Sequence, residues 1–312
     1  MPPRTPDGSA DADAGAVPAA PPGWKPPDVA PMHANWSAPG DGQWLPIADV
    51  RHPEDAPRMY KTLLHPDRNR SWAAVCVVAV ELSRAQLHLV AGRYEPESKE
   101  PAARDYPRPA VVPAEHHGDL LAAFNGGFKT THGNHGMHID GVTLVKPRKD
   151  SCTLVHYQDD TFTIRTWPHV AAEEGRMQWW RQTPHCMMEE GKLHPGLTAD
   201  GNTNWGATLE GSTVIRRSAI GLDETGRVLF IGIGDSTTAP AIARAMKHAG
   251  SFAIAQLDVN WSFPKFLTYE PREPGSTELV ARPLTSGFEF TEDEYVRQRS
   301  QRDFFYLVRK GR

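Results

Sequence analysis

Residues 121–141 read LAAFNGGFKTTHGNHGMHIDG: an apolar lead-in, an Asn-Gly-Gly turn, a histidine-rich loop and a hairpin. Asparagine tolerates the left-handed backbone region and the two glycines have no Cβ atom, so this turn can bring bare N–H groups close to a ligand. Successive N–H groups of this kind form concave sites that bind anions. A tight turn without any ligand is the alternative interpretation, and the rest of the chain must decide between them.

The whole chain has 312 residues, of which 39% are hydrophobic and 23% charged, and its net charge is -4. These values are typical of a soluble globular protein and lack the strongly basic balance of a nucleic-acid-binding domain. No apolar run approaches the roughly 18 residues that a transmembrane helix requires. We therefore expect one large domain with no nucleic-acid partner and no transmembrane segment.

Residues 1–44 are rich in Pro, Ala, Gly and Asp and have almost no apolar periodicity. Such a segment cannot bury enough apolar surface to offset the entropy cost of ordering it. We predict that residues 1–44 are a disordered leader or tether and that residues 45–312 form the folded domain. The start lacks the basic and apolar regions of a signal peptide, so these residues do not themselves indicate export.

The three cysteines, Cys76, Cys152 and Cys186, are too few and too scattered for a disulfide framework. Cys76 lies in an apolar run and is predicted to be a small buried residue. Cys152 and Cys186 can pair in an oxidising compartment, but the odd total is equally compatible with reduced thiols. The sequence leaves both states open.

Beyond Trp44 the apolar pattern is that of strands and turns, with helix used sparingly. It predicts a single α+β domain with a strand-rich mixed sheet as its core and a few flanking helices. The expected strands and strand pairs are 75–82 with 86–90, an inner strand that ends at Asn125, 137–139 with 142–145, 151–155 with 161–166, 215–222 with 227–233, and 251–259. The expected helix spans 239–250, with Pro240 near its start and Gly250 as its stop.

Several motifs occur in a fixed order along the chain. They are Asn125-Gly-Gly-Phe, the hairpin from Gly136 to Gly141, the run from Pro184 to Leu193, Arg217-Ser-Ala-Ile-Gly, the strand to Asp235, and the helix, Gly250 and strand that lead to Leu257-Asp258. From about residue 45 to the C-terminus, this series resembles the phosphodiester glycosidase family. The resemblance implies hydrolysis of a glycosidic bond to phosphate, on a glycan or sugar-phosphate substrate at the cell envelope, in a secreted or envelope-tethered protein.

Phosphate is a good leaving group, so it needs little help from a proton donor. A site of this kind instead needs cations and N–H donors that stabilise the negative charge of the phosphate. It also needs one carboxylate that activates water or stabilises the sugar cation. Alternation along a strand lets only one of the neighbours Arg216 and Arg217 face inward, and it does not decide which. The resemblance favours Arg217 as the phosphate anchor. Asn125 and the adjacent N–H groups of Gly126 and Gly127 are the expected anion cradle.

Asp258 and Asp235 each end a predicted strand, where a sheet presents functional side chains on its loops. We predict Asp258 as the acid/base or electrostatic carboxylate and Asp235 as a supporting carboxylate. For Asp235, a turn or N-cap role before the following helix is an equally good interpretation. Gly234-Asp235-Ser236 also resembles the start of a serine-esterase motif, but the Asp-x-x-His that such enzymes require does not follow it.

Further polar and aromatic side chains near these motifs are expected to bind the substrate. They are Lys129, His138, Asp140, Asn260, Trp205 and Trp261, together with Gly126 and Gly127. A tryptophan can stack on a sugar ring, although core packing is the commoner fate of any one tryptophan. Trp205 is the favoured sugar platform because it lies in a polar loop.

His132, His135 and His138 recur at every third residue, and such side chains can bind a divalent metal. An irregular loop rarely provides tetrahedral geometry by chance, so a polar wall that binds sugar hydroxyls is the favoured interpretation. We therefore expect no cofactor, and these three histidines are the candidate ligands for any metal. The sequence carries no signal for oligomeric state.

The chain departs from the family directly after Asp258. Members usually read Asp-Gly-Gly-Gly-Ser-Ser there, whereas this chain reads Asp258-Val-Asn-Trp-Ser-Phe263. A glycine-rich loop lets a substrate approach the backbone closely, and Val, Trp and Phe do not. We expect a narrower and more aromatic site, and the alternative to a hydrolase is a catalytically inactive glycan- or sugar-phosphate-binding domain.

Overall fold

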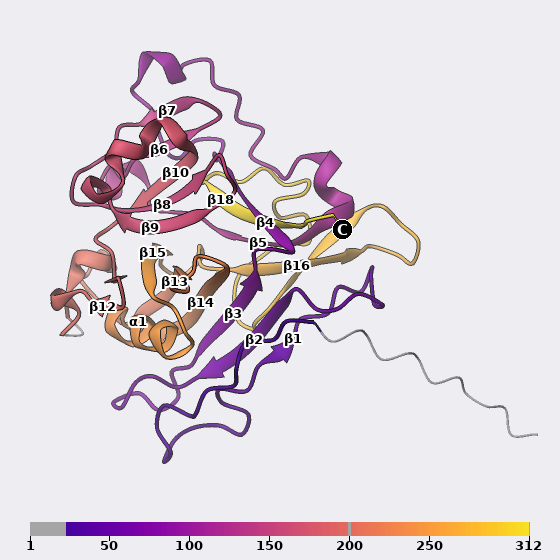
Figure 1. Cartoon of the computed structure of the whole chain (residues 1–312), viewed down its shortest axis with the longest axis vertical. Coiled ribbons are helices and arrows are strands. Elements are labelled where there is room, and N and C mark those ends of the chain that lie inside the picture. Colours follow the sequence, from indigo (N-terminus) through magenta and orange to yellow (C-terminus); the bar gives the residue numbers. More distant parts are fainter. Residues whose placement is uncertain (1–22, 199–200, 312) are drawn as a thin grey trace, which may run out of the picture.

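The computed structural model describes residues 23–198 and 201–311. Three sheets form the framework of a single strand-rich domain (Figure 1). The predicted α+β class is therefore confirmed. Where the sequence predicted a mixed sheet, every pair of named strands in the described residues is antiparallel.

The largest sheet has eight strands in the order β1-β2-β3-β14-β13-β15-β11-β12. They are β1 (Leu45–Pro46), β2 (Met59–Leu64), β3 (Val75–Glu81), β11 (Met188–Glu189), β12 (Lys192–Leu193), β13 (Ile215–Leu222), β14 (Val228–Thr237) and β15 (Ala253–Val259). Helix α1 (Ala239–His248) packs on this sheet against β3, β13 and β14. Thr238 caps the helix, because its Oγ1 accepts a hydrogen bond from the N–H of Ala241 (3.3 Å).

The other two sheets have five strands each. The second, at the top of Figure 1, has the order β7-β6-β10-β8-β9, and the third has the order β17-β16-β5-β18-β4. The second sheet contains β6 (Met137–Ile139), β7 (Val142–Val145), β8 (Cys152–Tyr157), β9 (Phe162–Thr166) and β10 (Met177–Thr183). The third contains β4 (Ala85–Val90), β5 (Leu120–Asn125), β16 (Phe266–Pro271), β17 (Leu279–Pro283) and β18 (Phe304–Arg309).

Short 3-10 helices connect many of these strands. They are η1 (Pro101–Ala103), η2 (Ala114–Asp119), η3 (Thr130–His132), η4 (Trp167–His169), η5 (Ala171–Arg176), η6 (Pro195–Thr198) and η7 (Thr203–Trp205). Within the two described ranges, no helix has both the length and the apolar character that crossing a bilayer demands.

The predicted hairpins β6–β7, β8–β9 and β13–β14 are confirmed, as are helix α1 and strand β15. The predicted pairing of residues 75–82 with 86–90 is wrong. β3 pairs with β2 and β14, whereas β4 pairs with β18 in another sheet. A short polar link between two apolar strands favours a hairpin, but here the chain crosses from one sheet to the next.

The main core lies where the three sheets face one another. Each sheet contributes apolar side chains to it, for example Val78, Phe124, Leu154, Ile220 and Phe305. A second cluster fills the space between the largest sheet and helix α1. Strands β3, β13 and β15 are covered on both faces, so they are buried along almost their whole length.

Part of the predicted leader contacts the domain. Trp44 is buried in the cluster beneath α1, and the ring of Trp24 lies edge-on to Tyr60 with centroids 5.9 Å apart. The N–H of Val29 donates to the carbonyl of Gly42 (2.9 Å). Residues 23–44 therefore lie on the domain, and residues 1–22 of the predicted leader lie outside the described residues.

Candidate functional site

Two adjoining pockets lie where β5 and β15 end. Pocket A has a volume of about 460 Å³ and pocket B one of about 240 Å³. Asp258, Phe263 and Arg302 line both pockets, so these three side chains form the boundary between them. Pocket A is also lined by polar residues that include His132, His135, Arg148, Asp150, Ser151, His185 and Asn260. Pocket B is also lined by Asn125, Gly126, Gly127, Lys265, Glu294 and Asp303, among others.

Asp258 is a buried carboxyl near the end of β15. Its Oδ2 forms an ion pair with the guanidinium of Arg302, and its Oδ1 accepts a hydrogen bond from the N–H of Val259 (2.9 Å). Burial raises the pKa of Asp258 to about 6, because the opposing effects of Arg302 and the Val259 N–H are smaller. This carboxyl can therefore gain or lose a proton near neutral pH, as a general acid or base must.

Arg302 is a site residue that the sequence analysis missed. Besides pairing with Asp258, its Cζ lies 3.2 Å from the ring centroid of Phe263, so a carboxylate and an aromatic ring hold it between the pockets. A guanidinium is suited to phosphate because its planar fork matches two oxygens. In the sequence, Arg302 is marked only by the Arg-Asp pair that it forms with Asp303 just before β18. Such pairs are too common to indicate a functional site.

The Asn-Gly-Gly turn binds a carboxylate of the protein itself. The N–H of Gly126 donates to the carbonyl of Asp303 (3.0 Å), and the N–H of Gly127 donates to its Oδ2 (2.9 Å). A Cβ atom at Gly126 would lie 2.2 Å from that Oδ2, and neither glycine has a positive φ. The glycines therefore permit a close approach, and the donors that were assigned to a substrate anion hold Asp303.

Arg181 in β10 balances the charge of Asp303 in a fully buried ion pair. Its Nε lies 2.9 Å from Oδ2 and its Nη2 lies 3.1 Å from Oδ1. The same guanidinium donates to the carbonyls of His135 (3.1 Å) and Phe128 (2.8 Å). These bonds anchor the backbone next to Arg302 from a strand of another sheet.

Asn125 ties several strand ends together. Its Nδ2 donates to the hydroxyl of Ser218 (2.8 Å), and its Oδ1 accepts from the N–H of Lys265 (3.1 Å). The side chain lines pocket B, but its amide is engaged by the protein. Asn125 therefore positions the segments that carry the site.

Arg217 is completely buried in β13 and lines neither pocket. Within the described chain, its guanidinium donates to uncharged oxygens, which are the carbonyls of Trp205 (2.7 Å), Gly206 (3.0 Å), Thr213 (2.7 Å) and Thr237 (3.2 Å) and Oε1 of Gln256 (3.3 Å). Burial lowers the pKa of Arg217 to about 9. Arg217 thus holds the loop between Trp205 and Thr213 in place through hydrogen bonds to its carbonyls. This geometry does not support the predicted role of Arg217 as a phosphate anchor.

Trp205 is likewise a core residue. Its ring is fully buried, and its Nε1 donates to the carbonyl of His185 (2.7 Å). The ring packs in the cluster beneath helix α1, so it offers no face to a sugar. The polar residues on either side of Trp205 in the sequence had favoured an exposed ring that stacks on a sugar.

Arg216 contacts the second predicted carboxylate, Asp235. The distance from its Nη2 to Oδ2 of Asp235 is 3.5 Å, and its guanidinium lies between the rings of Trp261 and Phe288, 4.4 Å from each centroid. A register shift between Ile215 and Arg217 interrupts simple alternation, and both arginines are buried. Asp235 lies outside both pockets, whereas Trp261 is 60% exposed with one face covered by Arg216.

The remaining predicted substrate-binding residues divide between pocket A and positions outside both pockets. Asn260 lines pocket A. His138 bonds to the hydroxyl of Thr143 (3.0 Å), and Asp140 accepts a hydrogen bond from the hydroxyl of Tyr106 (2.7 Å). His138, Asp140 and Lys129 line neither pocket.

The histidine loop is split in the structure. His132 and His135 line pocket A, whereas His138 does not. Nδ1 of His135 lies 2.9 Å from the hydroxyl of Ser151. Across residues 23–198 and 201–311, no group of three or more His, Cys, Asp or Glu side chains is placed to hold a metal ion. His132 and His135 therefore contribute polar side chains to the wall of pocket A.

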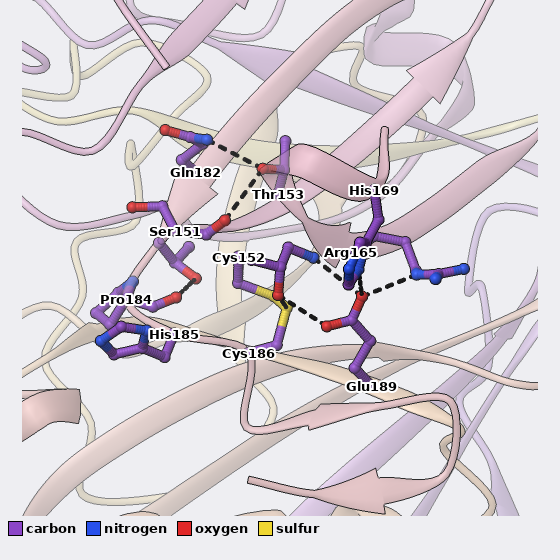
Figure 2. Close-up of a disulfide and its surroundings, with 12 residues drawn as sticks. Ser151, Cys152, Thr153, Arg165, His169, Gln182, Pro184, His185, Cys186 and Glu189 are labelled. Atoms are coloured by element: carbon purple, nitrogen blue, oxygen red, sulfur yellow. Dashed lines mark hydrogen bonds and ion pairs between the residues drawn. A yellow bond between two sulfur atoms is a disulfide. The ribbon is translucent and has the colours of Figure 1, made fainter. Parts of the chain in front are cut away.

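Cys152 at the start of β8 and Cys186 before β11 form a disulfide (Figure 2). Their Cα atoms are 4.6 Å apart, and the N–H of Cys152 also donates to the carbonyl of Pro184 (3.0 Å). Of the two states that the sequence left open, the structure has the oxidised pair. Cys76 is a buried free thiol, and burial raises its pKa to about 12.

Comparison with protein-family models and with curated proteins finds no match. Among solved structures, the chain is similar to the catalytic domain of zebrafish N-acetylglucosamine-1-phosphodiester alpha-N-acetylglucosaminidase, auto-inhibited by its pro-peptide. The identity is 14% over 91% of this chain and 87% of that one, with a TM-score of 0.49. A hypothetical protein from Synechocystis is 10% identical over 82% of this chain and 65% of that one (TM-score 0.43). An exported protein from Burkholderia pseudomallei is 12% identical over 76% and 74% (TM-score 0.40).

Proposed function

We propose that this protein is a hydrolase that cleaves a glycosyl phosphodiester or a related glycan linkage. The observation that carries the proposal is the buried Asp258–Arg302 pair at the boundary of the two pockets. It joins a carboxyl that titrates near neutral pH to a guanidinium suited to phosphate. The order of motifs along the chain, which resembles that of phosphodiester glycosidases, supports the same reaction class.

In the proposed reaction, Arg302 binds the phosphate and stabilises the charge that develops on it. The bond between the anomeric carbon and the phosphate oxygen breaks, and the electron pair leaves with the phosphate monoester. Water forms the new bond to the anomeric carbon, and ionised Asp258 accepts its proton. Asp258 then releases this proton to solvent, which its pKa of about 6 allows at neutral pH.

An oxidising location fits this proposal. The Cys152–Cys186 disulfide supports it, because disulfides persist outside the cytosol and are rare within it. We propose an extracytoplasmic protein whose substrate belongs to the cell envelope.

A catalytically inactive glycan- or sugar-phosphate-binding domain is the second candidate function. The loop after Asp258 favours it, since Val259, Asn260 and Trp261 stand where the resembled family usually has three glycines, and the side chains of Val259 and Phe263 line pocket A. The ring of Phe263 also holds the Arg302 guanidinium against Asp258.

Hydrolysis of a panel of chromogenic aryl and sugar 1-phosphodiesters tests the two functions. We expect wild-type protein to turn over at least one substrate, and Asp258→Asn to lower kcat/KM by about 10²- to 10⁴-fold because it removes the base. Activity should rise as the pH increases through about 6, where Asp258 ionises, and this limb should vanish in Asp258→Asn. Arg302→Lys keeps the charge but loses the planar fork, so it should lower kcat/KM through both a higher KM and a lower kcat.

Asp223→Asn is the matched control, because Asp223 is a turn carboxylate that accepts hydrogen bonds from two backbone N–H groups and lies outside both pockets. Binding of a phosphodiester without turnover would favour the inactive binding domain. Equal activity of wild type and Asp258→Asn would remove Asp258 from the mechanism.

A further inference from the structure

Pocket A contains a second polar group besides the Asp258–Arg302 pair. The hydroxyl of Ser151 and Nδ1 of His135 are 2.9 Å apart, and both buried residues line the pocket. A serine hydroxyl offers one donor and two acceptor positions, and a neutral imidazole offers one of each. The bond between them uses only one position on each side chain. The remaining positions can serve a ligand in pocket A.

The imidazole of His135 stays neutral at physiological pH. Burial, followed by the charges of Arg181 and Arg148, lowers the pKa of His135 to about 3. A neutral imidazole, which can both donate and accept a hydrogen bond, is suited to a hydroxyl or an amide. A phosphate is bound better by a positively charged side chain. Gly133 leaves room for the ring, since a Cβ atom there would lie 2.4 Å from Nε2 of His135.

The Cys152–Cys186 disulfide holds the backbone beneath this pair. Ser151 directly precedes Cys152, and His185, which also lines pocket A, directly precedes Cys186. Figure 2 shows Ser151, Pro184 and His185 gathered on one side of the disulfide. The carbonyl of Ser151 also accepts from the N–H of Trp167 (3.1 Å). These links restrict how far the Ser151 hydroxyl can move from the pocket.

We propose that His135 and Ser151 determine the specificity of pocket A by binding the neutral hydroxyl or amide groups of a sugar, with the disulfide as their support. The inference rests on the proposed function, since it takes the ligand to be a glycosyl phosphate. It divides the site in two: Arg302 binds the anionic part of the ligand, and the His135–Ser151 pair binds the sugar.

NMR titration with two kinds of probe tests this division. The probes are inorganic phosphate and the methyl glycosides of glucose, galactose, mannose and N-acetylglucosamine. We expect wild type to bind phosphate and at least one glycoside. His135→Ala and Ser151→Ala should each weaken that glycoside about tenfold, the effect of one or two lost hydrogen bonds, and leave phosphate affinity unchanged. Arg302→Lys should weaken phosphate and spare the glycoside.

Two further sets of variants separate recognition from folding. Tyr306→Phe is the matched control, because it also removes a hydroxyl bonded to a histidine Nδ1, that of His116 (2.7 Å), outside both pockets. Ser151→Thr keeps the hydroxyl and should retain glycoside binding. The double variant Cys152→Ser/Cys186→Ser should weaken glycoside binding and leave phosphate binding unchanged, whereas Cys76→Ala should change neither.

Two results would overturn the proposal. One is a wild-type protein that binds none of the glycosides, and the other is equal glycoside affinity in wild type, His135→Ala and Ser151→Ala. Phosphodiester hydrolysis that depends on Asp258 would persist in either case, so failure of this inference is distinguishable from failure of the proposed function.

Discussion

Asp258 and Arg302 face each other where water has little access, and this determines what each residue can do. Burial disfavours the charged carboxylate strongly enough that its pKa rises to about 6 in spite of the ion pair. Arg181 and Asp303, also buried, are joined by two hydrogen bonds. The reactive character of the site therefore belongs to the first pair and its rigidity to the second.

Asp258 should make stability depend on pH. Its folded pKa of about 6 lies above the ordinary 3.8, so the folded state binds the proton more tightly. The contribution of this proton to the free energy of unfolding is fully present below about pH 4 and is lost as the pH rises through 6. The total loss is about 3 kcal/mol. We expect the free energy of unfolding of wild type, relative to Asp258→Asn, to fall by about this amount between pH 4 and pH 7 in urea titrations. A difference that stays constant with pH would contradict the raised pKa.

At the scale of elements, the ends of strands build the site. β5 delivers Asn125 and the two glycines, β15 delivers Asp258, and the segment before β18 delivers Arg302. Backbone contact joins them directly, because the N–H of Asp258 donates to the carbonyl of Gly126 (2.9 Å). The Asn-Gly-Gly turn therefore serves the site by bringing three segments together.

Substitution of a turn glycine tests this close approach. Gly126→Ala places a Cβ atom 2.2 Å from Oδ2 of Asp303, so it should lower the free energy of unfolding by about 1–3 kcal/mol, as overpacking does. Gly118→Ala in η2 is the matched control, because a Cβ atom there meets nothing within 4 Å, and it should change stability by less than about 1 kcal/mol. Urea unfolding measures both, and equal stabilities would refute the contact.

At the scale of the whole molecule, cross-links between sheets hold the pocket walls. The Arg181–Asp303 pair connects the second sheet to the segment before β18, and the disulfide connects β8 to the segment before β11 of the largest sheet. Pocket A is lined from several of these segments at once. Its shape therefore depends on the assembled domain.

Loss of the disulfide should destabilise the domain. It closes a loop with a sequence separation of 34, which corresponds to about 3–4 kcal/mol of loop entropy removed from the unfolded chain. We expect Cys152→Ser/Cys186→Ser to lower the free energy of unfolding by about this amount in urea titrations. Dithiothreitol should lower the stability of wild type to the same level and leave the double variant unchanged. A wild type that is insensitive to the reductant would argue against this linkage.

Periodicity and turn chemistry in the sequence were sufficient for the class of the fold and for most local elements. Asp140-Gly141 predicted the β6–β7 hairpin, and Pro240 and Gly250 marked the two sides of helix α1. The pairing of β3 was not predictable in this way, because apolar strands covered on both faces fit several partners equally well. The surroundings of Arg217 were not predictable either, because the carbonyls of Trp205, Gly206 and Thr213 that its guanidinium binds belong to a loop that precedes β13.

The sequence by itself determined the strand-rich class, the hairpins β6–β7, β8–β9 and β13–β14, and the helix, because these follow from patterns among neighbouring residues. Only the tertiary structure decided that Arg302 pairs with Asp258, that Asp303 occupies the Asn-Gly-Gly turn, and that Trp205 is buried. Each of these depends on contacts between segments far apart in the chain. Burial, which such contacts create, then sets the charge state of Asp258, and no local pattern of residues encodes it.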